Sequence, residues 1–230
     1  LMLTFETQNH CFMELKPVFE FLEALQQNNN RDWFKANEER FRQSVTIVGQ
    51  LVQQLVVRIN AFDGSIGQPD TRDCIFRIYR DVRFSHNKDP YKTHFGAYIA
   101  EGGKKSLKAG YYVHLQPGAS FAGGGIYMPE PAVLKAIRNE IYYNTAEFKK
   151  IITAPEFTKY FDGIYGEKLK TSPKDFPKDF PEAALLAYKD YAVVHYFDDH
   201  SMTSESIIDQ LVGVFEAQRH FNAFLNRAFE

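Results

Sequence analysis

The residues best suited to chemistry lie in one basic and aromatic segment, residues 77–92, with the sequence RIYRDVRFSHNKDPYK. This segment holds five Lys or Arg residues and only two Asp residues. Arginine guanidinium groups are planar and can grip a phosphate or carboxylate group with two hydrogen bonds each. The segment therefore predicts a pocket for an anion, and its predicted ligands are Arg80, Arg83, Lys88 and Lys92.

Two tyrosines and a further arginine complete the predicted ligand set. Tyr91 lies in an Asp-Pro-Tyr turn, where its ring can stack on a ligand or its hydroxyl can donate a hydrogen bond. Tyr112 comes from a later strand. Arg31 stands at a helix start beside Trp33, the single tryptophan, which we interpret as a core anchor.

The same segment has a second interpretation. Asp81 lies between Arg80 and Arg83 and can form an ion pair with either of them. Ion-pair networks that serve only structure also collect Arg and Asp. An internal network that anchors a long loop therefore stays open beside the anion pocket.

A second polar group follows from strand alternation. Five side chains occupy the positions opposite the apolar ones in residues 94–99 and 111–116, namely His94, Tyr98, Tyr112, His114 and Gln116. If the two strands are neighbours, these side chains share one sheet face, which is then a pocket wall or the solvated side of the sheet. His114 is the candidate catalytic residue, because an imidazole can transfer protons near neutral pH.

Other patterns carry less chemistry. Residues 195–200 hold two His and two Asp, but their spacing fits no standard helix-borne metal pair, so we expect a loop with a capping Asp and no metal site. The sequence lacks the phosphate loop, dinucleotide, nucleophile-elbow and zinc-protease motifs, and it indicates no cofactor. Gly123, Gly124 and Gly125 predict a bulge or a close backbone approach.

Hydrophobic periodicity predicts the elements that position these residues. Expected helices cover residues 17–25, 30–63, 131–141, 146–152 and 203–225, with Asn30 and Thr203 as N-caps. Expected strands cover residues 74–80, 94–99, 111–116, 120–127 and 191–197. We therefore expect one α+β domain over residues 1–230. Its central, mainly antiparallel sheet of about five strands would pack with long N- and C-terminal helices.

Composition limits the function classes. The net charge of −2 argues against a surface that binds polyanions everywhere, so any affinity for phosphate must be local. Cys11 and Cys74 are too few for a disulfide framework and predict buried thiols in a reducing compartment. No apolar run is long enough to span a membrane, and no signal peptide is visible, so we expect the cytoplasm.

Several strings in this chain resemble a known family. They are NNRDWF (residues 29–34), RDVRFS (80–85) with Lys88, PYK (90–92) and GYYVHL (110–115). They are similar to the bacterial and fungal family called domain of unknown function 2461, over roughly residues 19–191. The resemblance implies an α+β fold and brings no established activity. Residues 174–181 differ from the family's pattern.

Three functions remain open on the sequence. The first is a pocket for a small anionic, phosphate-bearing ligand, with or without catalysis. The second is a nucleic-acid accessory protein that also uses the lysines of residues 104–108. The third is a protein that acts by protein contacts, with the basic segment as scaffolding. We expect no membrane partner, and the sequence indicates no oligomeric state.

Overall fold

The fold is organised around a four-stranded sheet. The computed structural model describes residues 13–171 and 173–230. The strands lie in the order β1-β2-β3-β4, and each is antiparallel to its neighbour. Their bounds are β1 (Phe95–Ile99), β2 (Gly110–Leu115), β3 (Ser120–Ile126) and β4 (Tyr191–Phe197).

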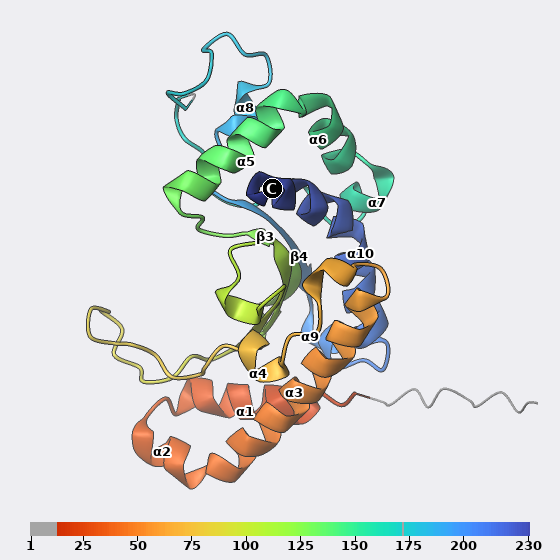
Figure 1. Cartoon of the computed structure of the whole chain (residues 1–230). Coiled ribbons are helices and arrows are strands. Elements are labelled where there is room, and N and C mark those ends of the chain that lie inside the picture. Colours follow the sequence, from red (N-terminus) through yellow and green to blue (C-terminus); the bar gives the residue numbers. More distant parts are fainter. Residues whose placement is uncertain (1–12, 172) are drawn as a thin grey trace, which may run out of the picture.

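Helices surround this sheet (Figure 1). The α-helices are α1 (Lys16–Gln27), α2 (Arg31–Ala36), α3 (Glu38–Asn60), α4 (Thr71–Cys74), α5 (Pro131–Tyr143), α6 (Thr145–Ile152), α7 (Pro155–Thr158), α8 (Ala183–Leu186), α9 (Asp199–Met202) and α10 (Ile207–Asn226). Short 3-10 turns are η1 (Gly64–Ile66), η2 (Gly103–Lys105) and η3 (Arg227–Phe229). The predicted α+β class is therefore correct.

One face of the sheet is buried beneath α10 and α3. Alternate residues of the strands point into this core, among them Tyr111 and Val113, which are at most 2% exposed. The ring of Tyr111 meets Phe215 of α10 with centroids 5.4 Å apart, and its hydroxyl donates to Asp63 at 2.6 Å. The opposite positions of the strands therefore face away from the helices and remain available for a site.

The strand expected over residues 74–80 is wrong, so the sheet has four strands and not five. Residues 76–94 instead form a projecting arm, called the arm below (Figure 1). Its two legs bond to each other, with Arg80 N–H donating to the Pro90 carbonyl at 2.9 Å and Lys92 N–H donating to the Ile78 carbonyl at 2.8 Å. Only isolated bridges form here, because Pro90 has no N–H to continue a ladder.

Two predicted helix boundaries also differ from the structure. The expected helix over residues 30–63 is broken at Asn37, whose side-chain amide donates to the Trp33 carbonyl at 2.9 Å and competes with the helical pattern. The closing helix begins at Ile207, because the Thr203 hydroxyl bonds back to the Asp199 carbonyl and ends α9. The predicted cap at Asn30 is confirmed, since its side chain accepts from Trp33 N–H at 2.9 Å.

Two smaller predictions concern glycine and cysteine. The register between β3 and β4 holds no extra residue, so the glycine run marks a close approach: a Cβ on Gly123 would collide with the Val193 carbonyl. Cys74 is buried as expected, and burial raises the pKa of its thiol to about 11. Cys11 lies outside the described residues. Within them, no helix is long and apolar enough to cross a membrane.

Candidate functional site

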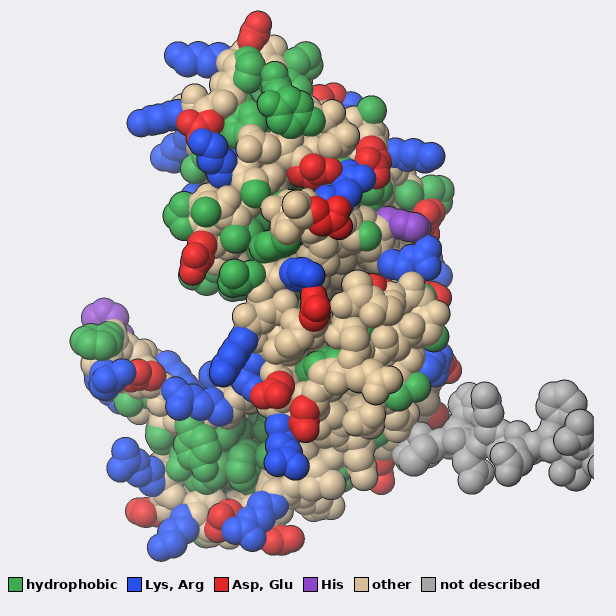
Figure 2. All heavy atoms as spheres, in the orientation of Figure 1, with side chains coloured by type: hydrophobic (Ala, Val, Ile, Leu, Met, Phe, Trp, Pro, Cys, Tyr) green, Lys and Arg blue, Asp and Glu red, His purple; other side chains and the backbone are tan. Residues whose placement is uncertain are grey.

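The open face of the sheet forms the floor of a cleft of about 680 Å³. Figure 2 shows the surface hollowed between the arm and the part of the chain that holds α5. The floor comes from the strands, one rim comes from the arm and residues 104–108, and the other comes from residues 127–133 and Tyr165. A cleft of this size, lined by aromatic rings and a few convergent polar groups, is typical of a ligand site.

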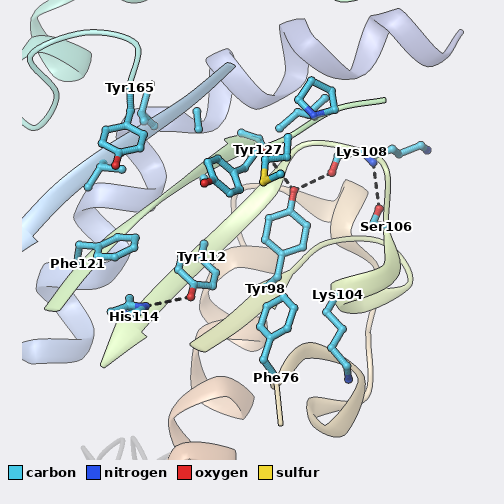
Figure 3. Close-up of a pocket in the computed structure, with 18 of the residues that line it drawn as sticks. Phe76, Tyr98, Lys104, Ser106, Lys108, Tyr112, His114, Phe121, Tyr127 and Tyr165 are labelled. Carbon is cyan, nitrogen blue, oxygen red and sulfur yellow. Dashed lines mark hydrogen bonds between the residues drawn. The ribbon is translucent and has the colours of Figure 1, made fainter. Parts of the chain in front are cut away.

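Three polar side chains form a hydrogen-bonded chain along β2 and the residue that follows it. His114 Nε2 lies 2.8 Å from Gln116 Oε1, and His114 Nδ1 lies 3.1 Å from the Tyr112 hydroxyl oxygen. A carbonyl oxygen only accepts, so Nε2 carries the proton and Nδ1 accepts from Tyr112. Figure 3 shows Tyr112 and His114 side by side on the sheet. The chain fixes the tautomer of a neutral histidine.

Aromatic rings cross the strands as a continuous ladder, called the aromatic ladder below. His94 stacks near His114 with centroids 4.3 Å apart, His114 stacks on Phe121 at 4.6 Å, and Phe121 meets the edge of Tyr196 at 5.9 Å. The strand register explains the order, because His114 pairs with Phe121 and Phe121 pairs with Tyr196. The rings of His94, His114 and Phe121 therefore cover one another's faces and pack as a continuous row across the floor of the cleft.

Glycines leave room for the tyrosine rings on this floor. Gly96 pairs with His114, and a Cβ there would lie 2.5 Å from the Tyr112 hydroxyl. Gly110 likewise leaves room for the Tyr98 ring, because a Cβ on Gly110 would lie 3.0 Å from that ring. These two glycines let the phenol rings lie against the sheet.

Burial keeps the ionisable groups of the floor neutral. Desolvation, and after it His114 and the charge of Lys92, together lower the pKa of His94 to about 4. Desolvation also lowers the pKa of His114, partly opposed by its bond to Gln116. Burial raises the pKa of Tyr112 to about 12. At neutral pH the site therefore presents two neutral imidazoles and a protonated phenol.

Three lysines line the cleft, and two of them already bind other groups of the protein. Lys108 pairs with Glu101 at 2.6 Å, and Lys104 donates to the backbone carbonyls of Arg72 and Asp73. Lys92 has no carboxylate within 4.0 Å among the described residues, and its ammonium lies 5.7 Å from the Phe76 ring centroid. Partial burial and Arg77 lower the pKa of Lys92. Among the described residues, Lys92 is therefore the cleft lysine whose ammonium has no carboxylate partner.

A family model described as a conserved hypothetical protein, DUF2461, matches residues 17–224. The chain belongs to DUF2461. A search of curated proteins found no match, and a search of solved structures found none.

The strings that carry the resemblance to DUF2461 lie together in the structure. The Asn29 side chain donates to the Tyr91 carbonyl at 2.9 Å and accepts from Tyr91 N–H at 3.2 Å. The Phe34 ring stacks on the Tyr91 ring with centroids 3.9 Å apart. The next residue, Lys92, then reaches the cleft floored by residues 110–115. These contacts fix the root of the arm beside the site.

The structure separates the predicted site residues of this DUF2461 chain into three groups. Lys92, Tyr112 and His114 meet in the cleft. Tyr91 packs at the arm root, where burial raises the pKa of its hydroxyl and the charge of Arg31 lowers it. Arg31 is therefore a neighbour of Tyr91 and lines a different surface from the cleft.

The remaining three predicted ligands hold the arm together. Arg83 makes a paired contact with Asp81, with the shortest N–O distance 2.7 Å. Arg80 donates to the Asp89 carbonyl and to Ser85, and Lys88 donates to the Val82 carbonyl at 3.0 Å. These bonds match the second interpretation of the basic segment, an internal network within a long loop. At the exposed end of the arm, Phe84 is 94% exposed.

Sequence reasoning missed much of the cleft. Phe121 and Tyr196 join the aromatic ladder. The walls of the cleft include Tyr127, Tyr165 and Phe76 (Figure 3). Alternation along β3 and along β4 could assign each residue to a face of its own strand, but the contact between Phe121 and Tyr196 depends on the register between the two strands. The capping Asp expected within residues 195–200 is confirmed, because the Asp198 side chain accepts from Ser201 N–H and caps α9. Among the described residues, no three His, Cys, Asp or Glu side chains gather in a group that could hold a metal ion.

Proposed function

We propose that the cleft binds a small phosphate-bearing molecule that also carries a flat ring. The observation that carries this proposal is Lys92, a partly desolvated ammonium that lies beside the Tyr112–His114–Gln116 chain and has no carboxylate partner among the described residues. An anion bound to Lys92 restores the stabilisation that the ammonium loses by leaving water. Two exposed rings of the cleft, Tyr127 and Tyr196, offer stacking for the ring of the same ligand.

The charges of the lining favour an anion over a cation. The lining holds three lysines and one carboxylate, Glu130, which is exposed at the rim. Both histidines are neutral at physiological pH, so they supply hydrogen-bonding atoms without charge. A ligand with one anionic group and one apolar ring matches both halves of this surface.

The hydrogen-bonded chain also supports a catalytic role for His114. A ligand hydroxyl placed against the Tyr112 oxygen would give its proton to Tyr112 while the Tyr112 proton moves to His114 Nδ1. Gln116 Oε1 would then stabilise the imidazolium through Nε2–H. In this proposal His114 is the general base, Tyr112 passes the proton, and Lys92 balances the negative charge that develops on the ligand.

A thermal-shift screen tests the binding proposal. Nucleoside phosphates and sugar phosphates are added at millimolar concentration to the wild type, Lys92→Gln and Lys88→Gln. At 100 times its Kd, a ligand stabilises the fold by about 2.7 kcal/mol, which raises the melting temperature measurably. We expect this rise in the wild type and in Lys88→Gln, whose ammonium bonds within the arm, and its loss in Lys92→Gln.

Two results would overturn the proposal. The first is that no phosphate compound in the screen raises the melting temperature of the wild type. The second is an equal rise in Lys92→Gln, which would place the anion elsewhere. For catalysis, a ligand found in this way is incubated with the wild type and with His114→Gln; equal turnover, or none in either, would remove His114 from the mechanism.

A further inference from the structure

Positive charge is concentrated around the cleft. The arm and the loop of residues 101–108 together carry eight Lys or Arg residues and three acids. The whole chain has 27 Lys or Arg residues and 29 acids, so the rest of the molecule is clearly acidic. Lysine and arginine side chains gather along the arm and beside its root in Figure 2. This local surplus of positive charge attracts a polyanion to the cleft, and the acidic remainder of the surface repels it.

Both basic segments border the same cleft. Each also has a cation that makes no hydrogen bond or ion pair within the described residues. Phe76 and Lys92 bring the arm to the rim, and Lys104 and Lys108 bring the loop. Next to these residues, the exposed side chains of Arg77 and Lys105 have no hydrogen bond or ion pair among the described residues. The charge around Lys92 therefore extends farther than one phosphate group requires.

The floor between these cations presents aromatic surface to solvent. Tyr196, at the end of the aromatic ladder, is 63% exposed, and Tyr127 on the opposite rim is 66% exposed. Neither hydroxyl makes a hydrogen bond within the described residues. Exposed rings beside a line of cations are the two components by which proteins bind single-stranded nucleic acid, since bases stack on the rings while phosphates meet the cations.

We propose that a single-stranded nucleic acid crosses the open face of the sheet, between the arm and the loop of residues 101–108. This inference rests on the proposed function, because one phosphate of the strand occupies the Lys92 site. Arg77 and Lys105 contact the flanking phosphates, and Tyr196 stacks on a base. A duplex does not fit this description, because its bases hide their faces within the stack.

Fluorescence anisotropy with labelled 15-nucleotide oligo(dT) and oligo(U) tests the proposal on the full chain. With three phosphate contacts, log Kd changes with log salt with a slope of about 2, so Kd rises about 20-fold between 50 and 200 mM salt. At least one of the two oligonucleotides is expected to bind in this way. A duplex of the same length is expected to bind at least about tenfold more weakly, because it offers no free base to stack.

Matched variants locate the strand on the molecule. Arg77→Gln with Lys105→Gln is expected to lower the salt slope by about 1.4, because two phosphate contacts are lost. Lys150→Gln with Lys178→Gln removes two exposed lysines outside the cleft lining and should leave the slope unchanged. Tyr196→Ala is expected to weaken binding about tenfold. Tyr143→Ala, at a residue that is 78% exposed on α5, should not weaken it.

The outcomes separate this inference from the function on which it rests. The inference is overturned if neither oligonucleotide binds, if the duplex binds as tightly, or if the two double variants behave alike. If a nucleoside phosphate still stabilises the wild type through Lys92, only the extended track is lost. If oligonucleotides bind and Lys92→Gln binds them as tightly as the wild type, the strand lies elsewhere and the inference is wrong, while the thermal-shift screen alone decides the Lys92 site.

Discussion

His94 and His114 lie ring against ring in the cleft, with centroids 4.3 Å apart and planes 32° from parallel. They come from two neighbouring segments, the end of the arm and the C-terminal end of β2. Burial and the nearby charge of Lys92 lower the pKa of both rings. Protonation of either ring would place a second positive charge beside Lys92, so this stack belongs to the neutral form of the site.

Acid should therefore destabilise the fold through His94. The pKa of His94 is near 6.5 in the unfolded chain and about 4 in the folded chain. Between these values the unfolded chain binds more protons, so this stabilisation is complete above about pH 6.5 and is lost as the pH falls toward 4. Because the ring is only partly buried, we expect a loss on the order of 2 kcal/mol between pH 7 and pH 4.5.

Urea unfolding of the wild type and His94→Phe at these two pH values measures the loss. The phenyl ring keeps the stack and cannot titrate, so the variant should lose about 2 kcal/mol less than the wild type. Carboxylates titrate alike in both proteins and cancel in the difference. An equal loss in the two proteins would mean that His94 is not held neutral by the fold.

Removing the Tyr112 hydroxyl should raise the pKa of His114. The hydroxyl donates to Nδ1 at 3.1 Å and so favours the unprotonated ring. A hydrogen bond worth about 1 kcal/mol corresponds to a shift of about 0.7 pKa unit. Titration of the His114 ring protons by NMR in Tyr112→Phe measures this shift. Tyr165→Phe removes another cleft hydroxyl, one without a bond to His114, and serves as the control; a shift of the same size there would refute the assignment.

The sequence predicted the polar side of the floor because strand alternation is local. His94, Tyr98, Tyr112 and His114 share one face, as their spacing indicated. The stack of His114 on Phe121 depends on the register between β2 and β3. The contact of Phe121 with Tyr196 depends on the register between β3 and β4, which are separated by more than 60 residues. Alternation within one strand carries no information about that register.

The arm shows a different limit of sequence reasoning. Residues 74–80 alternate like a strand, but a strand also needs a partner edge, and these residues bond mainly to their own returning leg. Charge alone could not decide between ligand and scaffold for Arg80, Arg83 and Lys88. Their partners are backbone carbonyls, a serine and a neighbouring aspartate, which the residue types permit but do not specify.

Asn29 should control the position of the arm. Its side chain makes two hydrogen bonds to the backbone of Tyr91 across 62 residues of sequence. Asn29→Ala removes both, and we expect a loss of about 2 kcal/mol in the free energy of unfolding. Hydrogen exchange at the amides of Arg80 and Lys92 should also be faster in Asn29→Ala than in the wild type. Asn28→Ala removes one exposed bond to the Ala24 carbonyl and is the control; similar losses in both variants would show that Asn29 has no special role.

Two glycines of the sheet should lose stability to different degrees when replaced by alanine. At Gly96 the new Cβ would lie 2.5 Å from the Tyr112 hydroxyl, the far end of a side chain that can rotate away. We expect Gly96→Ala to cost about 1 kcal/mol and to raise the pKa of His114 as Tyr112→Phe does, because the bond between Tyr112 and His114 breaks.

At Gly123 the new Cβ would collide with the Val193 carbonyl, a backbone atom of the adjacent strand. This atom can move only if β3 and β4 separate, so Gly123→Ala should cost about 3 kcal/mol or more. Urea unfolding gives both stabilities, and NMR titration of His114 gives the second readout for Gly96→Ala. If Gly96→Ala kept the wild-type titration of His114, the glycine would not be what lets Tyr112 reach the imidazole, and the proton path proposed from that contact would lose its structural support.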